Sequence, residues 1–121
     1  MTRAPEILSF AVADDERGSL IPIEFGDVPF TVRRTFVVTG PVGGAVRGNH
    51  TVPCAQLLCL VSGSAAVQLG ADEFSLSEAA LLDQPGQSVL LAAGSYVRYS
   101  LADESSVLLV LAEQPYRRRN E

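Results

Sequence analysis

The fold of this chain is most constrained by a succession of short apolar segments that alternate with turns rich in glycine and proline. Short segments at such spacing are typical of an all-β sandwich or barrel. The segments expected to form strands are Ile7–Val12, Leu20–Phe25, Val32–Thr39, Gln56–Val61, Ala65–Leu69, Val89–Leu91, Ser95–Leu101 and Val107–Ala112. One exception is Ser75–Glu78, whose capping-box pattern predicts a single helical turn before Pro85.

Length and composition indicate one compact domain. A chain of 121 residues with 47% hydrophobic residues has the size of a single domain, and such a chain buries roughly two thirds of its extended surface on folding. With 7% aromatic residues and no tryptophan, the core is expected to be mainly aliphatic. We expect a single domain over residues 1–121, ordered from about residue 7 to about residue 116.

Charge and hydropathy restrict the partners of the protein. A net charge of −5 and a pI near 4.8 disfavour nucleic-acid binding, which needs clustered basic side chains. The basic run Arg117–Arg119 is expected to be a solvated tail. No apolar run approaches the roughly 18 residues that span a bilayer, and the sequence shows no secretory signal. We therefore expect no membrane association and a cytoplasmic location.

Two glycine-anchored spacings are similar to the two sequence motifs of the cupin proteins. From Gly44 the chain reads Gly-x5-His-x-Val-x3-Gln-x6-Gly, and from Gly86 it reads Gly-x5-Ala-Ala-Gly-x2-Val-x3-Leu. The metal-ligand positions of those motifs here hold His50, Val52, Gln56 and Val97. A divalent ion needs three or four nitrogen, oxygen or sulfur donors. Because two valines and an amide do not supply them, we expect a protein with no metal and no other cofactor.

Longer segments resemble a narrower family, the sugar 3,4-ketoisomerases, which are WxcM-like cupins that act on nucleotide-linked 4-keto-6-deoxyhexoses. The matching segments are Asp15–Leu20, Arg47–His50, Gln56–Ser64, Leu82–Pro85 and Val107–Ala112. The resemblance implies a cupin double-stranded β-helix, or jelly-roll barrel, that works without metal and is usually a homodimer. A homodimer through Ile7–Val12 is expected, because this apolar segment would otherwise leave an exposed edge.

The same resemblance implies roles for individual residues. The family moves a proton between C3 and C4 of the sugar with two histidines of a His-Ala-His segment and a tyrosine on an earlier strand. The first histidine corresponds to His50, the second to Val52 and the tyrosine to Val37. Arg47 resembles a contact to the phosphate side of the substrate. His50 is the candidate catalytic residue, with a purely structural histidine as the alternative, and a surface or dimer ion pair is the alternative for Arg47.

Strand parity predicts which side chains line the interior of the barrel. Alternate residues of a strand share a face, which groups His50, Val52, Gln56 and Leu58. Val97, Tyr99 and Leu101 form a second such group. Parity thus adds Val52, Gln56, Leu58, Val97, Tyr99 and Leu101 to the two positions that the resemblance implies, Val37 and Arg47, as the expected substrate-binding residues. They predict an apolar tube in which His50 and Gln56 are the polar points.

Three functions are compatible with these patterns. Each changed position replaces an acid–base group by an aliphatic or aromatic one, which favours a metal-free cyclase or cycloaddition catalyst acting on an apolar polyene or polyketide intermediate in bacterial natural-product biosynthesis. Such an enzyme accelerates its reaction mainly by confinement, and useful ketoisomerase activity is then not expected. The alternatives are a 3,4-ketoisomerase of a nucleotide-linked 4-keto-6-deoxyhexose and a cupin that binds a small molecule without catalysis.

Overall fold

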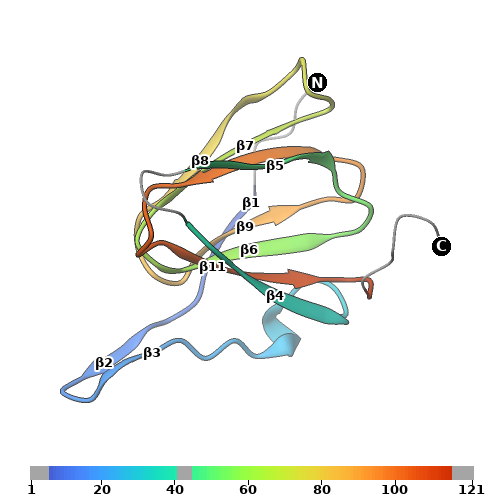
Figure 1. Ribbon diagram of the computed structural model, residues 1–121. Coiled ribbons are helices and arrows are strands. Elements are labelled where there is room, and N and C mark those ends of the chain that lie inside the picture. Colours follow the sequence, from blue (N-terminus) through green and yellow to red (C-terminus); the bar gives the residue numbers. More distant parts are fainter. Residues whose placement is uncertain (1–5, 41–44, 116–121) are drawn as a thin grey trace.

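The computed structural model describes residues 6–40 and 45–115, and over these residues it consists of strands and one 3-10 turn, η1 at Phe25–Asp27 (Figure 1). The strands are β1 Glu6–Ser9, β2 Ala13–Asp15, β3 Gly18–Leu20, β4 Arg34–Thr39, β5 Ala45–Thr51, β6 Gln56–Ser62, β7 Ala65–Gly70, β8 Ser77–Leu82, β9 Gln87–Leu91, β10 Tyr96–Leu101 and β11 Val107–Ala112. The all-β class predicted from the sequence is confirmed.

Two antiparallel sheets pack face to face. The five-stranded sheet has the order β1-β9-β6-β11-β4, and the four-stranded sheet has the order β5-β10-β7-β8. Strands β2 and β3 form a hairpin that projects from the sandwich (Figure 1). Because β8 contacts β9 near one edge of the sandwich, β4 and β5 are the edge strands of the opposite side. This β4–β5 side is where the polar residues discussed below are found.

The core between the sheets is aliphatic, as the composition predicts. Both sheets contribute alternate residues to one cluster of buried side chains, and the half-buried Phe36 and Tyr99 pack against it. The buried members are Val38, Val52, Leu58, Leu60, Ala65, Val67, Leu82, Val89, Leu91, Val97, Leu101, Leu108 and Val110. A second cluster covers the outer face of the five-stranded sheet, where Val28 packs with Leu57 and Leu111.

Two local predictions are wrong. The segment expected to be a strand from Leu20 to Phe25 leaves the β2–β3 hairpin at Leu20 and ends in η1. The capping-box segment does not form a helical turn: Ser77–Leu82 is strand β8, paired along β7 from Ala65↔Leu82 to Leu69↔Ser77. The pairing satisfies the backbone of β8 and buries Leu82, which a local capping signal does not offset.

Two further expectations concern the basic tail and association with a membrane. The tail Arg117–Arg119 lies outside the described residues. Within the described residues, no helix has the length and apolar character needed to cross a bilayer.

Candidate functional site

Arg47 and His50 of β5 project toward the interior side of the sandwich. Strand β5 pairs with β10 so that Arg47 lies opposite Tyr99 and His50 opposite Val97. Directly opposite residues of an antiparallel pair share a face, and Val97 is buried in the core while Tyr99 packs against it. Because β5 is an edge strand, Arg47 and His50 are nevertheless exposed to solvent. Both side chains are therefore accessible from the β4–β5 side of the sandwich.

The inward residue of β4 is Phe36, and Val37 faces away from the site. Phe36 packs against the core between the sheets. Val37 lies opposite Leu109, which packs on the outer cluster, and it is 61% exposed. The expected placement of Val37 in the wall of the cavity is therefore wrong, because the alternation along β4 points it outward. The position nearest the site on this strand carries an aromatic ring without a hydroxyl group.

Two further polar side chains belong to the five-stranded sheet. Gln56 of β6 is a buried polar residue opposite Ala112 of β11, and Arg34 of β4 lies opposite the same Ala112 on its other side. Arg34 shares the face of Phe36, and its guanidinium carbon is 4.8 Å from the centre of the Phe36 ring. Arg34 and Gln56 thus flank Ala112 on the inner face of the sheet.

Tyr99 has the most informative electrostatics of the group. Burial raises the pKa of its phenol above the usual value of 10.0, and the neighbouring charge of Arg47 acts in the opposite direction. The phenol is therefore neutral at physiological pH and serves as a hydrogen-bond donor rather than as a base. Arg47 is the cross-strand partner of Tyr99, so the two side chains project from the same face of the sheet.

The apolar residues expected to line a tube instead fill the core. Val52, Leu58, Val97 and Leu101 are all 2% exposed or less. The backbone of Val52 is held to the turn before β10, since its N–H donates to Ser95 at 2.8 Å and its carbonyl accepts from Gly94 at 2.9 Å. These side chains are packed in the core between the two sheets and do not form the wall of an open channel.

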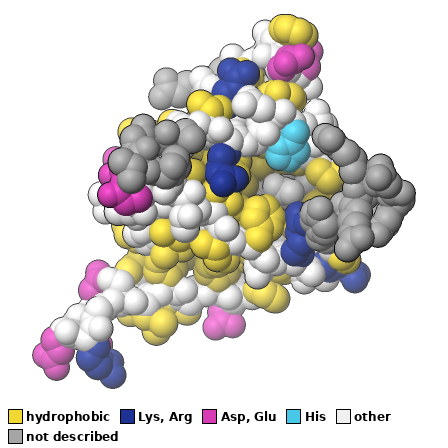
Figure 2. All heavy atoms as spheres, in the orientation of Figure 1, with side chains coloured by type: hydrophobic (Ala, Val, Ile, Leu, Met, Phe, Trp, Pro, Cys, Tyr) yellow, Lys and Arg dark blue, Asp and Glu magenta, His cyan; other side chains and the backbone are white. Residues whose placement is uncertain are grey.

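The resulting site is more polar than the sequence reasoning predicted. Figure 2 shows the imidazole at the surface of this side of the molecule, together with hydrophobic and basic side chains. Sequence reasoning missed Arg34 and Phe36. The adjacent basic pair Arg33–Arg34 at the start of a β-branched strand was the available signal for a charged group here. Among the described residues, no three His, Cys, Asp or Glu side chains come together as metal ligands. The expectation of a metal-free protein stays a prediction.

The chain matches known proteins along almost its whole length. Residues 3–120 match the model of a family described as FdtA: WxcM-like, C-terminal. A solved 3,4-ketoisomerase from Helicobacter canadensis is 26% identical, with a TM-score of 0.80 over 97% of this chain and 87% of that chain. The sugar 3,4-ketoisomerase QdtA from Thermoanaerobacterium thermosaccharolyticum, solved in complex with TDP, is 27% identical, with a TM-score of 0.80 over 97% and 85%.

A third similar structure is the WlaRB TDP-quinovose 3,4-ketoisomerase from Campylobacter jejuni. It is 26% identical, with a TM-score of 0.78 over 98% of this chain and 91% of that chain. A search of curated proteins finds no match. The agreement with these structures confirms the cupin jelly-roll fold.

These findings overturn the expectation of a cyclase or cycloaddition catalyst for an apolar polyene. The three solved structures described above are 3,4-ketoisomerases, and none of the three points to polyketide chemistry. The expectation failed because it took the valines for the walls of a dry tube. They are buried in the core, whereas Arg47 and Tyr99 face the interior from one sheet, and Arg34 and Gln56 flank Ala112 on the inner face of the other. The chain belongs to the family described as FdtA: WxcM-like, C-terminal.

Proposed function

We propose that this protein is a 3,4-ketoisomerase of a TDP-linked 4-keto-6-deoxyhexose. The observation that carries the proposal is the likeness, over 97% of the chain, to sugar 3,4-ketoisomerases at 26–27% identity, one of them solved with TDP. The placement of His50 and Arg47 on the same side of β5 supports it, because the reaction needs a proton carrier beside a cation that binds the diphosphate.

The reaction moves a carbonyl group from C4 to C3 of the sugar without net oxidation or reduction. A base removes the proton from C3, the electron pair of that C–H bond forms a C3–C4 double bond, and the C4 carbonyl oxygen becomes an enediolate oxygen. A proton then returns to C4, while the proton of the C3 hydroxyl passes to the C4 oxygen, which leaves a carbonyl at C3 and a hydroxyl at C4. The site must therefore supply a group that exchanges protons near neutral pH and donors that stabilise the enediolate.

His50 is the group that suits the proton transfer, since an imidazole changes its charge near neutral pH. It takes the proton from C3, exchanges protons with the solvent that reaches this exposed side chain, and delivers a proton to C4 on the same face of the sugar. The neutral phenol of Tyr99, kept protonated by its burial, donates a hydrogen bond to the enediolate oxygen. The guanidinium of Arg47 lies beside the phenol and attracts the negative diphosphate. With Val52 in the position of a second histidine, a single imidazole performs both proton transfers.

The test is an NMR assay with TDP-4-keto-6-deoxyglucose, the sugar nucleotide seen with a variant of the QdtA enzyme, carried out in D2O. We expect a 3-keto product and deuterium at C4. His50→Ala should lower kcat by about 10² to 10⁴-fold, the usual contribution of a general acid–base group. Val37→Ala is the matched control, since Val37 faces away from the site, and it should keep wild-type kcat.

Two results would contradict the proposal. One is a wild-type protein that binds TDP and gives neither product nor deuterium exchange, which would support a cupin that binds small molecules without catalysis. The other is a His50→Ala variant, folded as judged by its amide NMR spectrum, that retains the wild-type rate.

A further inference from the structure

Strand β5 carries one residue more than its partner β10. Val97 pairs with His50 and Arg98 pairs with Gly48, which leaves Asn49 without a cross-strand partner. Gly48 has a φ of 84° and Asn49 a φ of 54°, so both residues are in the left-handed region. This is a β-bulge, a feature that bends a strand locally and re-aims its side chains.

The bulge is the reason that Arg47 and His50 share a face. In a regular strand, residues three positions apart project to opposite faces. The additional residue shifts the alternation by one position, so that Arg47 opposite Tyr99 and His50 opposite Val97 both project inward. Without the bulge, one of the two side chains would point away from the site.

The residue types at the bulge fit this geometry. A Cβ atom added to Gly48 would lie 2.9 Å from the carbonyl oxygen of Val97 and 3.3 Å from the ring of Tyr99, so no larger residue fits without a shift. Asn49 adopts a left-handed conformation that asparagine tolerates better than most residues. Gly48 therefore allows close approach to β10, and Asn49 forms the tip of the bulge.

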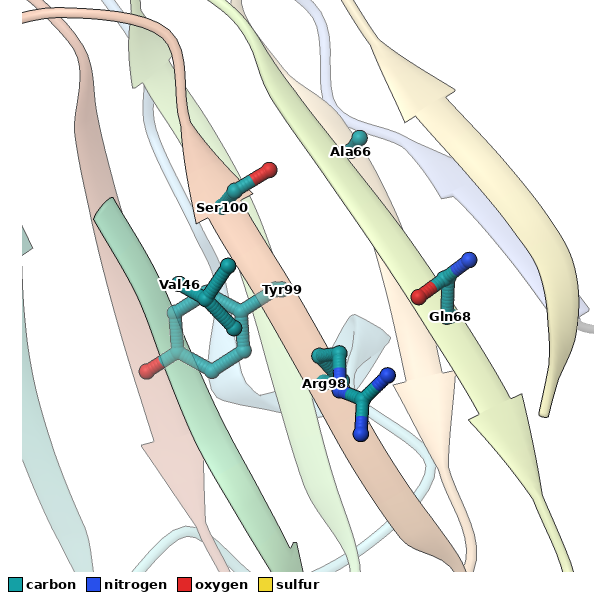
Figure 3. Close-up of a pocket in the computed structure, with 6 residues that line it drawn as sticks. All are labelled: Val46, Ala66, Gln68, Arg98, Tyr99 and Ser100. Atoms are coloured by element: carbon teal, nitrogen blue, oxygen red, sulfur yellow. The ribbon is translucent and has the colours of Figure 1, made fainter. Parts of the chain in front are cut away.

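Arg98 holds the tip of the bulge from the outer face of the sheet. Its Nε–H donates a hydrogen bond to Oδ1 of Asn49 at 2.6 Å. Arg98 lies between the inward residues Val97 and Tyr99, so its side chain projects outward. Figure 3 shows Arg98 with Val46 and Gln68 on the near side of the strands, whereas the Tyr99 ring passes behind β10. Arg98 belongs to a shallow pocket of about 190 Å³ on that outer face.

We propose that Arg98 is a positioning residue for the site on the other side of the sheet: its hydrogen bond to Asn49 holds the Gly48–Asn49 bulge and thereby fixes the direction of the His50 imidazole. This inference rests on the proposed function for its effect on catalysis, but its effect on the imidazole does not depend on any substrate. A hydrogen bond with a charged donor is stronger than a neutral one, and the residue that it holds is the immediate neighbour of His50.

Three single variants separate this role from a general role in the sheet. Arg98→Met removes the Nε–H donor and keeps a long side chain. Asn49→Gly removes the acceptor and keeps the left-handed backbone accessible. Gln68→Ala is the matched control, because Gln68 lines the same outer pocket from β7 and does not belong to the bulge.

The first measurement uses the protein without a ligand. The chain has a single histidine, so the imidazole protons of His50 give one set of NMR signals. Wild-type protein should show nuclear Overhauser effects between these protons and the methyl groups of Val97, the cross-strand partner of His50. Arg98→Met and Asn49→Gly should each weaken them, while Gln68→Ala should preserve them. Unchanged amide contacts between β10 and β7 serve as the check that the sheet is folded.

The second measurement is kinetic. Each single variant at Arg98 or Asn49 should lower kcat for TDP-4-keto-6-deoxyglucose by roughly tenfold to a hundredfold, because the imidazole moves. KM should change by less than about threefold, because Arg47, the proposed diphosphate-binding residue, remains. The double variant should be no slower than the slower single variant, because both changes remove the same hydrogen bond.

The outcomes separate the two proposals. Wild-type imidazole contacts in Arg98→Met or Asn49→Gly, additive losses of kcat in the double variant, or an equal loss in Gln68→Ala would each overturn the positioning role. If Arg98→Met loses the contacts between β10 and β7, its sheet is disturbed and its imidazole contacts carry no information. The result for Asn49→Gly then decides whether the hydrogen bond positions His50. Weakened imidazole contacts in a protein whose wild type has no isomerase activity would support the positioning role and refute the ketoisomerase proposal.

Discussion

Single residues decide how much acid–base chemistry the site retains. Val52, at the position of a second histidine, is fully buried, and its backbone is tied to Ser95 and Gly94, so an imidazole there would have to displace packed core. Tyr99, which the sequence suggested only as part of a wall, is a neutral phenol held between the core and Arg47. In the proposed function, the chemistry of the site therefore depends on one imidazole and one phenol rather than on two imidazoles.

The raised pKa of Tyr99 predicts a loss of stability at alkaline pH. Because burial raises this pKa above 10.0, the folded state retains the phenol proton at a pH where the unfolded state releases it. The contribution of the phenol to the free energy of unfolding should therefore be complete below pH 10. It should be lost as the pH rises through the folded-state pKa. Urea unfolding from pH 9 to pH 11 should show a shallower fall for Tyr99→Phe than for wild type.

Cys59 also affects stability at alkaline pH, so wild type must be compared with Tyr99→Phe to isolate the effect of Tyr99. Burial also raises the pKa of its thiol, above 9.0, so it contributes an alkaline loss of the same sign to both. The difference between wild type and Tyr99→Phe isolates the phenol. An identical pH dependence of the two proteins would show that the phenol is as well hydrated in the folded state as in the unfolded state.

At the level of elements, a turn that joins the two sheets packs tightly on a neighbouring loop. The turn between β6 and β7 places Gly63, with a φ of 74°, against Ser106, and a Cβ atom there would lie 2.6 Å from the Ser106 Cα. Ser106 is fully buried, and its hydroxyl oxygen accepts a hydrogen bond from the N–H of Ser64 at 3.1 Å. This turn therefore packs directly on the loop before β11.

Gly63→Ala and Gly94→Ala form a matched pair that tests this packing. Gly94 also has a left-handed φ, of 89°, but an added Cβ atom would meet nothing within 4 Å. Gly94→Ala should lower the free energy of unfolding by about 1–2 kcal/mol, the conformational cost alone. Gly63→Ala should cost more, because Ser106 must also move. If urea unfolding showed the same loss in free energy of unfolding for both variants, the β6–β7 turn would be able to move away from Ser106 without a further energetic cost.

At the level of the whole molecule, the apolar groups at its edges point to a second copy of the chain. Strand β1 is the free edge of the five-stranded sheet, and its Ile7 is 46% exposed. Leu20 is 64% exposed on the hairpin that projects from the sandwich (Figure 1). Free strand edges with apolar side chains favour pairing with another chain. The homodimer expected from the sequence stays a prediction. Ile7 and Leu20 are the positions at which we expect its interface.

Light scattering after size-exclusion chromatography should give twice the chain mass of 12.8 kDa at micromolar concentration. Ile7→Asp should shift the protein toward the monomer, because a charge on the edge strand opposes pairing. The comparison variant is Val37→Asp, since Val37 is 61% exposed on β4, which is the opposite edge of the sheet that contains β1. A monomer mass for wild type would refute the homodimer.

The sequence by itself determined the all-β class, the aliphatic core and the place of the candidate histidine, because alternation, glycine-rich turns and motif spacing are local properties of the chain. Tertiary structure decided which side chains meet. The resemblance that placed Val37 in the wall did not show that it faces outward, because which face of a strand is buried is set only when a second sheet covers it. Nor could parity place Arg47 beside His50, because their common face arises from a bulge that exists only where β5 pairs with β10.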